Sequence, residues 1–550
     1  MAVAKLYNVA LLSHRDGIGG LLAALCGSGC FHPSDREGLV DDPQILELAS
    51  KAHGVYSEAN SLLETATATG PTPSVGPGGL IYDGDMVQFV SALTQSMRTM
   101  KAEFDQGTPG PQDREELCSQ LAGLREQGLV VFNDLRRIKV FPNLKTLVLV
   151  QGYVPADGLP NFRRCVGDYL LLCEPVEEKG SRDPCVPTLL RNKRVGSAFE
   201  EVTLAPGAPK YSDIDPTPIV AFVFPLFFGM MFADIGRGLA LIAAGSYMRY
   251  RMKKQLYWAK LLQVIGISAA AFGAIKGDFF GIAFSTPFSR FLYIPEIYNG
   301  TVNMGAVVFL LEVAIVIGIL HLSSAYVISV IDEVRSGRLI DALTTSIPTL
   351  IFYWSSVLLG LAVVGAGSQL SGLFASNAPT PLFLQVLGLK IPVRVTAAIS
   401  LPQAVAALTV LILGRTVADV ARHSGRTTDL AALGQSLMDA FLRPIEFLAN
   451  TLSYIRLAVL LITGSILGSL IAELNSAGLV WFPVVIFANV GLIAIEGVIV
   501  YVQDLRLNIF EWLSNFQEGT GIPFVPLQPM ATPQSIDRNE DVRSETLVSA

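Results

Sequence analysis

Charged residues are scarce in this chain. Asp, Glu, Lys and Arg account for 16% of its 550 residues, whereas 51% of the residues are hydrophobic. Because about a quarter of the residues of an ordinary soluble protein are charged, this composition excludes a chain that is soluble throughout. The charges crowd into the first 215 positions and the last 30. Between them lie repeated apolar runs long enough to cross a bilayer, so we expect an integral membrane protein with a soluble N-terminal part.

The soluble part lacks several functional signatures. The chain does not open with a basic flank and a long apolar core, so we expect no cleavable signal peptide and a cytoplasmic location. Gly17-Ile-Gly-Gly is not followed by the Lys-Ser or Lys-Thr of a phosphate-binding loop. All six cysteines fall here without the paired spacing of a zinc site, which predicts free thiols, no metal and no cofactor. A net charge of −7 argues against nucleic acid as a partner.

Strand and helix patterns alternate within residues 1–215. The segments Tyr7–Ser13, Thr146–Val150 and Tyr169–Cys173 are rich in apolar residues and are predicted as strands. Between the first two, apolar residues recur at helical spacing over 43–65, 83–104 and 112–136. We predict a cytoplasmic α/β lobe, closed by strands from both ends of the domain, with a helical-hairpin arm between them.

Apolar segments of membrane-spanning length follow, and we predict eight spans in a membrane domain that covers residues 216–514. They are Pro218–Ala233, Ile235–Tyr250, Ala259–Phe284, Met304–Val330, Thr345–Gly365, Val395–Leu413, Phe441–Leu474 and Val480–Leu513. The first pair is short, and the last two spans are long. Residues 515–550 are predicted as a cytoplasmic tail, disordered from about residue 528 because it is polar and contains proline.

Loop charges give the predicted orientation. Basic clusters occupy 249–254, 335–338 and 415–426, whereas the loops between them in the chain carry few charges. Positively charged loops favour the cytoplasmic side of a membrane. Eight spans and a cytoplasmic N-terminus place all three clusters inside, together with the C-terminus, whereas seven spans would put some of them outside.

One apolar segment contains a cation. On a helix, Glu446, Asn450, Ser453 and Arg456 follow one another at spacings of four, three and three, and therefore share one face. An Arg at mid-membrane costs roughly 2.5–3.5 kcal/mol and is usually retained where it faces a protein interior or a watery pathway. The alternative is an Arg near a helix end whose head group reaches the interface. A second membrane Arg, Arg506, weakens that alternative.

The last apolar segment carries a second polar stripe. Asn489, Glu496 and Gln503 recur every seven residues, and Arg506 lies three residues beyond. On the preceding segment, small residues that include Gly464 and Gly468 follow the first Arg and predict a closely packed neighbour.

Four further ionisable residues are candidates for an ion pathway, because such residues are functional by default when they lie away from the interface. Asp234 and Asp278 lie beside glycines or in probable turns, and helix capping at the surface is an equal alternative for both. Glu312 and His321 are nine residues apart, which puts them on opposite faces of a helix. A packing role is an equal alternative for His321.

These motifs resemble a known family, namely subunit I, the a-type subunit, of the archaeal and bacterial V/A-type rotary ATPases. The matching stretches keep their order across the whole membrane half, and they are Asp213–Gly236, Gly277–Gly281, Gly318–His321, Leu448–Leu457, Leu505–Glu511 and Phe516–Phe524. In the N-terminal half the likeness rests chiefly on the opening strand and on Gly152-Tyr-Val-Pro.

The resemblance implies a non-catalytic stator subunit in the cell membrane of a prokaryote. Such a subunit forms two ion half-channels against a proteolipid c-type ring and couples proton or sodium translocation to ATP hydrolysis or synthesis elsewhere. The implied partners are that ring, the peripheral-stalk subunits, the central stalk, the ATP-hydrolysing head and the lipid bilayer. A fixed guanidinium favours the ionised ring carboxylate, and Arg keeps its charge when desolvated.

By this resemblance Arg456 is the essential arginine, Arg506 its companion and Glu496 a half-channel carboxylate. The predicted site residues are Arg456, Arg506, Glu496 and Glu446, supported by Asn450, Ser453, Gln503 and Asn489, with Asp234, Asp278, Glu312 and His321 as half-channel candidates. The alternative function is a stand-alone secondary ion transporter or channel, but the sequence shows no inverted repeat of broken helices.

Overall fold

The computed structural model describes residues 3–36, 38–67, 85–105, 111–142, 144, 146–176, 185–192, 196–252, 256–284, 304–367, 373, 391–422, 430–476 and 482–528. The chain divides into two compact units, one made of residues 1–191 with 521–550 and the other of residues 192–520. The boundary predicted at residue 215 is the start of the membrane domain rather than the division between these two units, and it stays a prediction. The predicted disorder beyond residue 528 lies outside the described residues.

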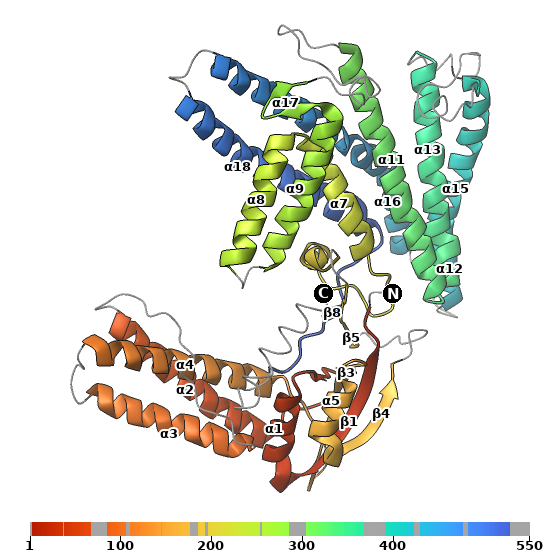
Figure 1. The fold of residues 1–550 in the computed structure, drawn as a ribbon. Coiled ribbons are helices and arrows are strands. Elements are labelled where there is room, and N and C mark those ends of the chain that lie inside the picture. The colour runs from red at the N-terminus through yellow and green to blue at the C-terminus, as the bar shows by residue number, and fades with distance from the viewer. Residues whose placement is uncertain are drawn as a thin grey trace. The chain divides into compact units, whose positions relative to one another are not determined.

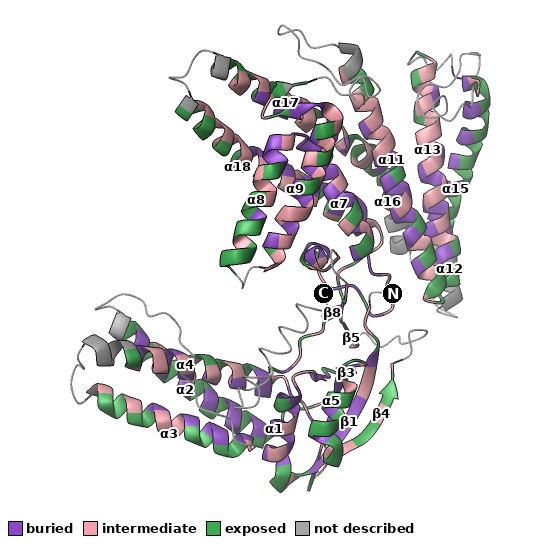
Figure 2. Cartoon of the chain, viewed as in Figure 1, coloured by how far each residue is buried: buried purple, intermediate pink, exposed green. Residues whose placement is uncertain are grey.

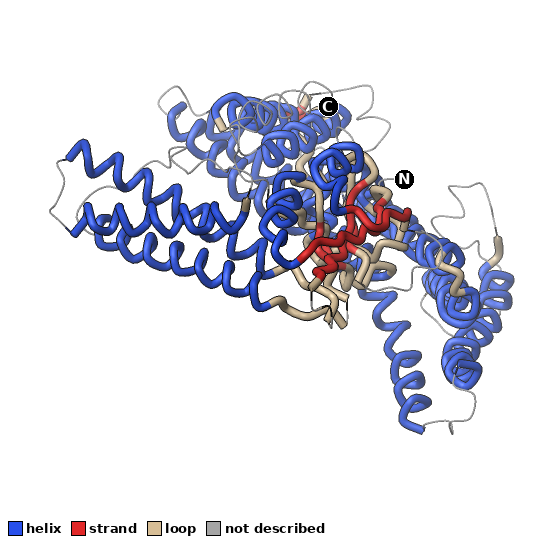
Figure 3. Tube along the Cα trace, turned by 90° about the horizontal axis from the view of Figure 1, so that it is seen from below, coloured by secondary structure: helices blue, strands red, loops and turns tan. Residues whose placement is uncertain are grey.

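The first unit contains a four-stranded antiparallel sheet in the order β2-β3-β1-β4. Its strands are β1 (Leu6–His14), β2 (His32–Pro33), β3 (Leu147–Pro155) and β4 (Leu170–Pro175). The central pair has Leu6 opposite Pro155 and His14 opposite Leu147. Figure 3 shows these strands, in red, gathered into one sheet. Helices α1 (Ile18–Ser28) and α5 (Leu159–Val166) pack together and contribute to the same core.

Three long helices form the arm of this unit. They are α2 (Pro43–Thr67), α3 (Met86–Asp105) and α4 (Pro111–Arg136). The arm therefore has three helices rather than the two of a hairpin, and Figure 1 shows them side by side. Figure 2 shows buried and exposed residues alternating along these helices, and their buried apolar residues belong to one core, as the helical spacing predicted. The short strand β5 (Pro187–Thr188) pairs with β8 (Ile522–Pro523), so the chain returns to this unit after residue 520.

The second unit is almost entirely helical. Its helices are α6 (Glu200–Leu204), α7 (Thr217–Met231), α8 (Ile235–Arg251), α9 (Leu256–Lys276), α11 (Met304–Arg335), α12 (Leu339–Asp341), α13 (Ile347–Gly365), α15 (Val393–Arg422), α16 (Leu430–Ser453), α17 (Ile455–Ser476) and α18 (Phe482–Arg506). Within the described residues, six helical segments are long and apolar enough to cross a membrane. The fold class is therefore confirmed: the chain is a polytopic helical membrane protein with a small N-terminal sheet region.

The two remaining predicted spans form helices α7 and α8, which have 15 and 17 residues and fall below the length of the other six. The third predicted span, Ala259–Phe284, was drawn too long, because α9 ends at Lys276. Gly277 has a φ of 83° and stops the helix, and the chain then turns through the hairpin of β6 (Asp278–Phe279) and β7 (Ile282–Ala283). In Figure 1, α7, α8 and α9 lie beside α17 and α18.

Candidate functional site

Arg456 lies just after a break in a long helix. Helix α16 ends at Ser453 and α17 begins at Ile455, with the fully buried Tyr454 between them. The single stripe predicted from Glu446 to Arg456 is therefore divided. Glu446 is exposed, Asn450 and Ser453 are half-buried, and the Arg456 side chain is 20% exposed.

Arg456 and Arg506 meet at one carboxylate. The Arg456 Nη1 atom lies 3.9 Å from Glu511 Oε1, and the Arg506 Nε atom lies 3.5 Å from the same oxygen. The Glu511 side chain is 5% exposed, whereas that of Arg506 is 57% exposed. We call these three residues the arginine–glutamate cluster. Its contacts are longer than ordinary charge-assisted hydrogen bonds, so both guanidiniums are held loosely.

Glu511 was not among the predicted site residues, and the local backbone explains why. On a regular α-helix, residues five apart point roughly 140° away from each other. The segment η8 (Leu507–Trp512) is instead a π-helix, in which the i to i+5 hydrogen-bonding pattern brings such residues onto one face. The sequence shows that Glu511 follows Arg506 by five residues. The α-helical period assumed in the sequence analysis, however, places the two side chains on different faces of the helix.

Several aromatic side chains pack around the helix break that precedes Arg456. His321 Nδ1 lies 2.7 Å from the Tyr454 hydroxyl, and the His321 ring stacks on Trp512 at 5.1 Å between centroids. The Trp512 Nε1–H donates to Ser324 Oγ at 2.9 Å, which ties η8 to α11. His321 therefore contacts Tyr454 and Trp512, which neighbour Arg456 and Glu511 in the sequence. Its Nε2 atom is buried without a hydrogen-bond partner among the described residues.

A second charged cluster lies where α8, α9, α17 and α18 approach one another. Arg237 Nη1 lies 2.7 Å from Glu496 Oε2, and Arg237 Nε lies 3.3 Å from Asp234 Oδ2. Lys276 Nζ lies 2.7 Å from Asp278 Oδ2. All five side chains are at most 11% exposed. We call these residues the Asp234 cluster. It joins three predicted residues, and Arg237 and Lys276 were not among them.

Backbone groups hold Asp234 in place. It is the N-cap of α8, and its Oδ1 accepts hydrogen bonds from the backbone N–H of Arg237 at 3.1 Å and of Phe280 at 3.0 Å. Its Oδ2 accepts from the Gly281 N–H at 3.2 Å. Asp234 thus caps a helix, as one of its two alternatives expected, but it is buried rather than at the surface and also pairs with Arg237. Its role in an ion pathway stays a prediction.

Glycines of α17 make room for this cluster. A side chain at Gly464 would collide with the Glu496 carboxylate, and one at Gly468 would collide with the Arg237 guanidinium. The small residues were expected to admit a neighbouring helix. At these two positions they admit a buried ion pair, and Gly468 also approaches the backbone of Gly281.

The other predicted residues lie outside both clusters. Asn489 Nδ2 donates to the Val485 carbonyl of its own helix at 2.9 Å. Gln503 and Glu312 are half-buried on α18 and α11. The predicted site residues also did not include Asp504, which is fully buried.

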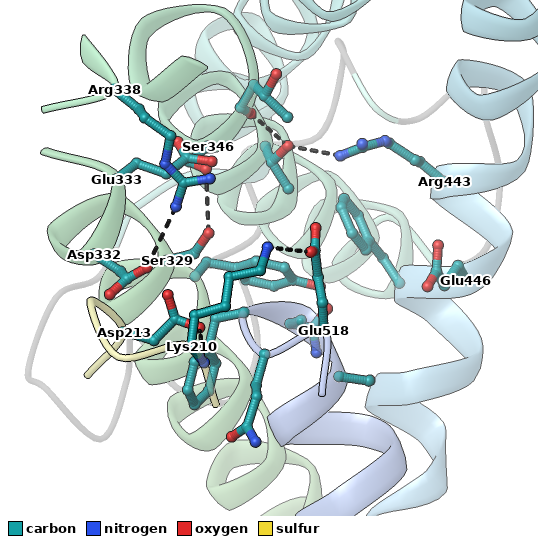
Figure 4. Close-up of a pocket in the computed structure, with 18 residues that line it drawn as sticks. Lys210, Asp213, Ser329, Asp332, Glu333, Arg338, Ser346, Arg443, Glu446 and Glu518 are labelled. Carbon is teal, nitrogen blue, oxygen red and sulfur yellow. Dashed lines mark hydrogen bonds and ion pairs between the residues drawn. The ribbon is translucent and has the colours of Figure 1, made fainter. Parts of the chain in front are cut away.

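Glu446 lines a polar pocket of about 390 Å³. Figure 4 shows the residues that line this pocket, among them Arg443, Arg338 and the ion pair of Lys210 with Glu518. The Lys210 Nζ and Glu518 Oε2 atoms are 2.7 Å apart. The Lys210 ammonium holds the pKa of Glu518 below its usual range. The pocket therefore offers charged groups of both signs next to Glu446.

The known proteins that this chain matches all point to the same family. Residues 124–268 match the V-type ATPase 116kDa subunit family. The A-type ATP synthase subunit I of Aeropyrum pernix is 24% identical over 422 residues, which cover 69% of this chain and 57% of that protein. The subunit I of Archaeoglobus fulgidus is 37% identical over 146 residues, which cover 25% and 21%.

The V-type ATP synthase subunit I of Chlamydia trachomatis is 23% identical over 492 residues, which cover 76% of this chain and 67% of that protein. This chain thus spans only part of the length of the Aeropyrum and Archaeoglobus proteins. The matches confirm the resemblance drawn from the sequence motifs.

Proposed function

We propose that this chain, a relative of subunit I of the A- and V-type ATP synthases, is the membrane stator subunit of a rotary ATPase. In this role it forms two ion half-channels against a proteolipid c-type ring and couples proton or sodium movement to ATP hydrolysis or synthesis by other subunits. The observation that carries the proposal is the loosely held Arg456 at the break between α16 and α17.

The geometry of Arg456 suits a transient partner. Its nearest carboxylate oxygen lies 3.9 Å away, and its Nη1 has no hydrogen-bond partner among the described residues. This nitrogen is buried and unsatisfied within the chain, and we assign the 20% exposed guanidinium to a carboxylate that arrives from a neighbouring subunit. A guanidinium at that point favours the ionised carboxylate and so makes it release its proton or sodium ion. Arg keeps its charge through this step, which Lys does less reliably.

The faces that surround Arg456 are apolar and uncovered. In the most apolar stretch of Leu442–Glu473 only 22% of the residues are buried, and in that of Pro483–Asn515 only 11%, against 33% in the other four candidate spans. Exposed side chains on α17 and α18 include Val459, Leu470, Ile495, Val498 and Val502. We assign this surface to the ring, because a guanidinium stranded in lipid would be costly.

The two polar regions are offset along the helices, as half-channels require. Glu496 and Arg506 are ten residues apart on α18, or about 15 Å. In the orientation given by the basic loops, α7 and α9 run outward, so the Asp234 cluster lies toward the external side. The pocket beside Glu446 then belongs to the cytoplasmic half-channel. The candidate residues Glu312 and His321 stay predictions.

The ends of the membrane unit support this orientation. Residues 1–191 and 521–528 belong to one compact unit, so the chain leaves that unit and returns to it. An even number of crossings satisfies this connection. Single cysteines in place of Arg251 and Phe284, in a background without other cysteines, should be labelled from opposite sides of the membrane. Labelling of both from one side would contradict the orientation.

The first unit fits the role of a stator arm, because a three-helix arm extends from a small sheet. We expect it to bind peripheral-stalk subunits. Isolation of the tagged full-length chain from membranes in mild detergent tests the assignment. A proteolipid ring and stalk subunits should accompany the chain at fixed stoichiometry. Isolation of the chain alone, with ion transport retained in vesicles, would instead support the stand-alone transporter.

A further inference from the structure

We propose that Glu511 positions Arg456 for its task, and that the Asp504–Asn508 pair presents Glu511 by holding the π-helical turn. This inference rests on the proposed function, because it concerns how the translocation arginine is kept ready between encounters with the ring. Glu511 is a positioning residue here, since it acts on the passing ion only through Arg456.

The contacts of Glu511 orient Arg456 without occupying it. The carboxylate is buried, and its Oε1 lies 3.9 Å from Arg456 Nη1 and 3.5 Å from Arg506 Nε. These distances exceed those of hydrogen bonds, which fall mostly between about 2.7 and 3.2 Å for N–H donors to oxygen. The Glu511 carboxylate thus attracts the Arg456 guanidinium and orients it. At 3.9 Å the Arg456 Nη1 atom makes no hydrogen bond to Glu511, so the guanidinium can still pair with the incoming carboxylate.

Glu511 also separates two like charges. The Arg456 Nη1 and Arg506 Nε atoms cannot be more than about 7.4 Å apart, because both lie close to the same oxygen. Without the carboxylate between them, the two guanidiniums would repel each other in a medium of low dielectric constant. Arg506 is 57% exposed and Arg456 only 20%, so the less buried partner can move away more freely.

A buried pair holds the turn that carries Glu511. Asn508 Nδ2 donates to the Asp504 backbone carbonyl at 3.0 Å and to the Asp504 Oδ1 atom at 2.8 Å. Both side chains are at most 1% exposed. Asn508 is the second residue of the π-helix Leu507–Trp512, so these bonds tie the π-helix to the last turn of α18. A return to α-helical register would rotate Glu511 away from both arginines.

Charge-specific rescue tests this inference in the assembled complex. ATP-driven ion uptake is measured in vesicles that contain the wild-type complex, E511Q, R506Q or the double variant R506Q/E511Q. E511Q should lower uptake at least tenfold, because both positive charges remain without their counter-ion. The double variant should recover uptake to the level of R506Q alone, because the repulsion is removed. Normal uptake by E511Q, or a double variant as impaired as E511Q, would overturn the inference.

Control variants distinguish failure of this inference from failure of the proposed function. Glu201→Gln removes an exposed carboxylate on α6 and should not change uptake. Arg456→Gln is assayed in parallel: if it pumps normally, the proposed function fails, whereas if it is inactive and E511Q is normal, only this inference fails. Should E511Q not assemble with the ring, Asn508→Ala decides. It leaves all three charges in place and should lower uptake several-fold with the ring bound, and unchanged uptake would contradict the role of the pair.

Discussion

The Asp234 cluster and the arginine–glutamate cluster lie in the same membrane unit and hold their charges differently. In the first, Arg237 is 3% exposed and contacts Glu496 at 2.7 Å. In the second, the shortest contact is 3.5 Å and Arg506 is more than half exposed. Both clusters use Arg and Glu, so residue type alone does not distinguish them.

The difference separates two uses of intramembrane charge. The close, buried pair of Arg237 with Glu496 joins α8 to α18 at 2.7 Å and stabilises one arrangement of α8, α17 and α18, although Arg237 Nε and Nη2 have no hydrogen-bond partner among the described residues. A loose pair at the edge of an uncovered apolar face can exchange partners. Under the proposed function, burial and contact distance together distinguish Arg237, which stabilises the packing of helices, from Arg456, which would pair with a passing carboxylate.

The largest effect on folding is expected at Arg237. Arg237→Gln leaves Asp234 and Glu496 buried without their cation, and removal of one partner of a buried ion pair costs about 3–5 kcal/mol. The thermal unfolding temperature of the chain in detergent should fall markedly, and less chain should reach the membrane. Arg249→Gln, at an exposed position of the same helix, serves as the control for stability and should not change the unfolding temperature.

A somewhat smaller effect is expected at Gly464. Gly464→Val places atoms where the Glu496 carboxylate lies, so the Asp234 cluster must shift or open. Overpacking of this kind costs about 1–3 kcal/mol, measurable as a lowered unfolding temperature. Gly491→Ala, which meets no atom within 4 Å, is the matched control. Equal stability of the Gly464 variant and the control would show that the cluster is not tightly packed against α17.

A milder change in activity is expected at Arg506. Arg506→Lys keeps a positive charge at a side chain that is 57% exposed, and Glu511 retains Arg456 as a partner. ATP-driven uptake should fall by no more than several-fold, with ring stoichiometry unchanged. Complete loss of uptake would mean that Arg506 is as indispensable as Arg456 and that the two arginines do not differ in role.

In the first unit, the burial of His32 predicts a small dependence of stability on pH. The Val525 N–H donates to His32 Nδ1 at 3.1 Å, and Arg137 Nη2 donates to the Val525 carbonyl at 2.5 Å. Burial, together with the nearby Arg137, lowers the pKa of His32 to about 4. The stability contributed by neutral His32 is thus fully present above its usual pKa of 6.5, and it is lost as the pH falls toward 4.

The 521–527 segment should therefore exchange its amide hydrogens faster at pH 5 than at pH 7, after correction for intrinsic rates. Burial raises the pKa of Asp134 to about 6, so its contribution has the opposite sign and is lost as the pH rises. His32→Gln isolates the histidine, because only its share of the pH effect disappears. An identical pH response in wild type and variant would exclude His32 as its source.

Part of the candidate site was predictable from the sequence, because charges inside long apolar runs stand out. Arg456, Arg506 and Glu496 were found in this way. Glu511 was not, because a π-helix changes the period that relates it to Arg506. Arg237 was missed because its partner Glu496 lies 259 residues away, and only the packing of α8 against the last two spans brings them together. The periodicity of one segment carries no information about such a contact.

The fold shows the same limits. Helix positions followed from apolar periodicity, whereas Tyr454 at the break packs against His321, which in turn stacks on Trp512. The end of α9 could have been read from Gly277, yet the apolar residues beyond it extended the predicted span.

The most direct test of the account measures ATP-driven ion uptake by reconstituted complexes that carry Arg456→Gln or Arg456→Lys, with subunit stoichiometry determined on the same samples. The account predicts that both complexes assemble with the ring and that neither transports ions, because Gln lacks the charge and Lys loses it more readily on desolvation. Near-normal uptake by an assembled Arg456→Gln complex would contradict it and would assign Arg456 a structural role like that of Arg237.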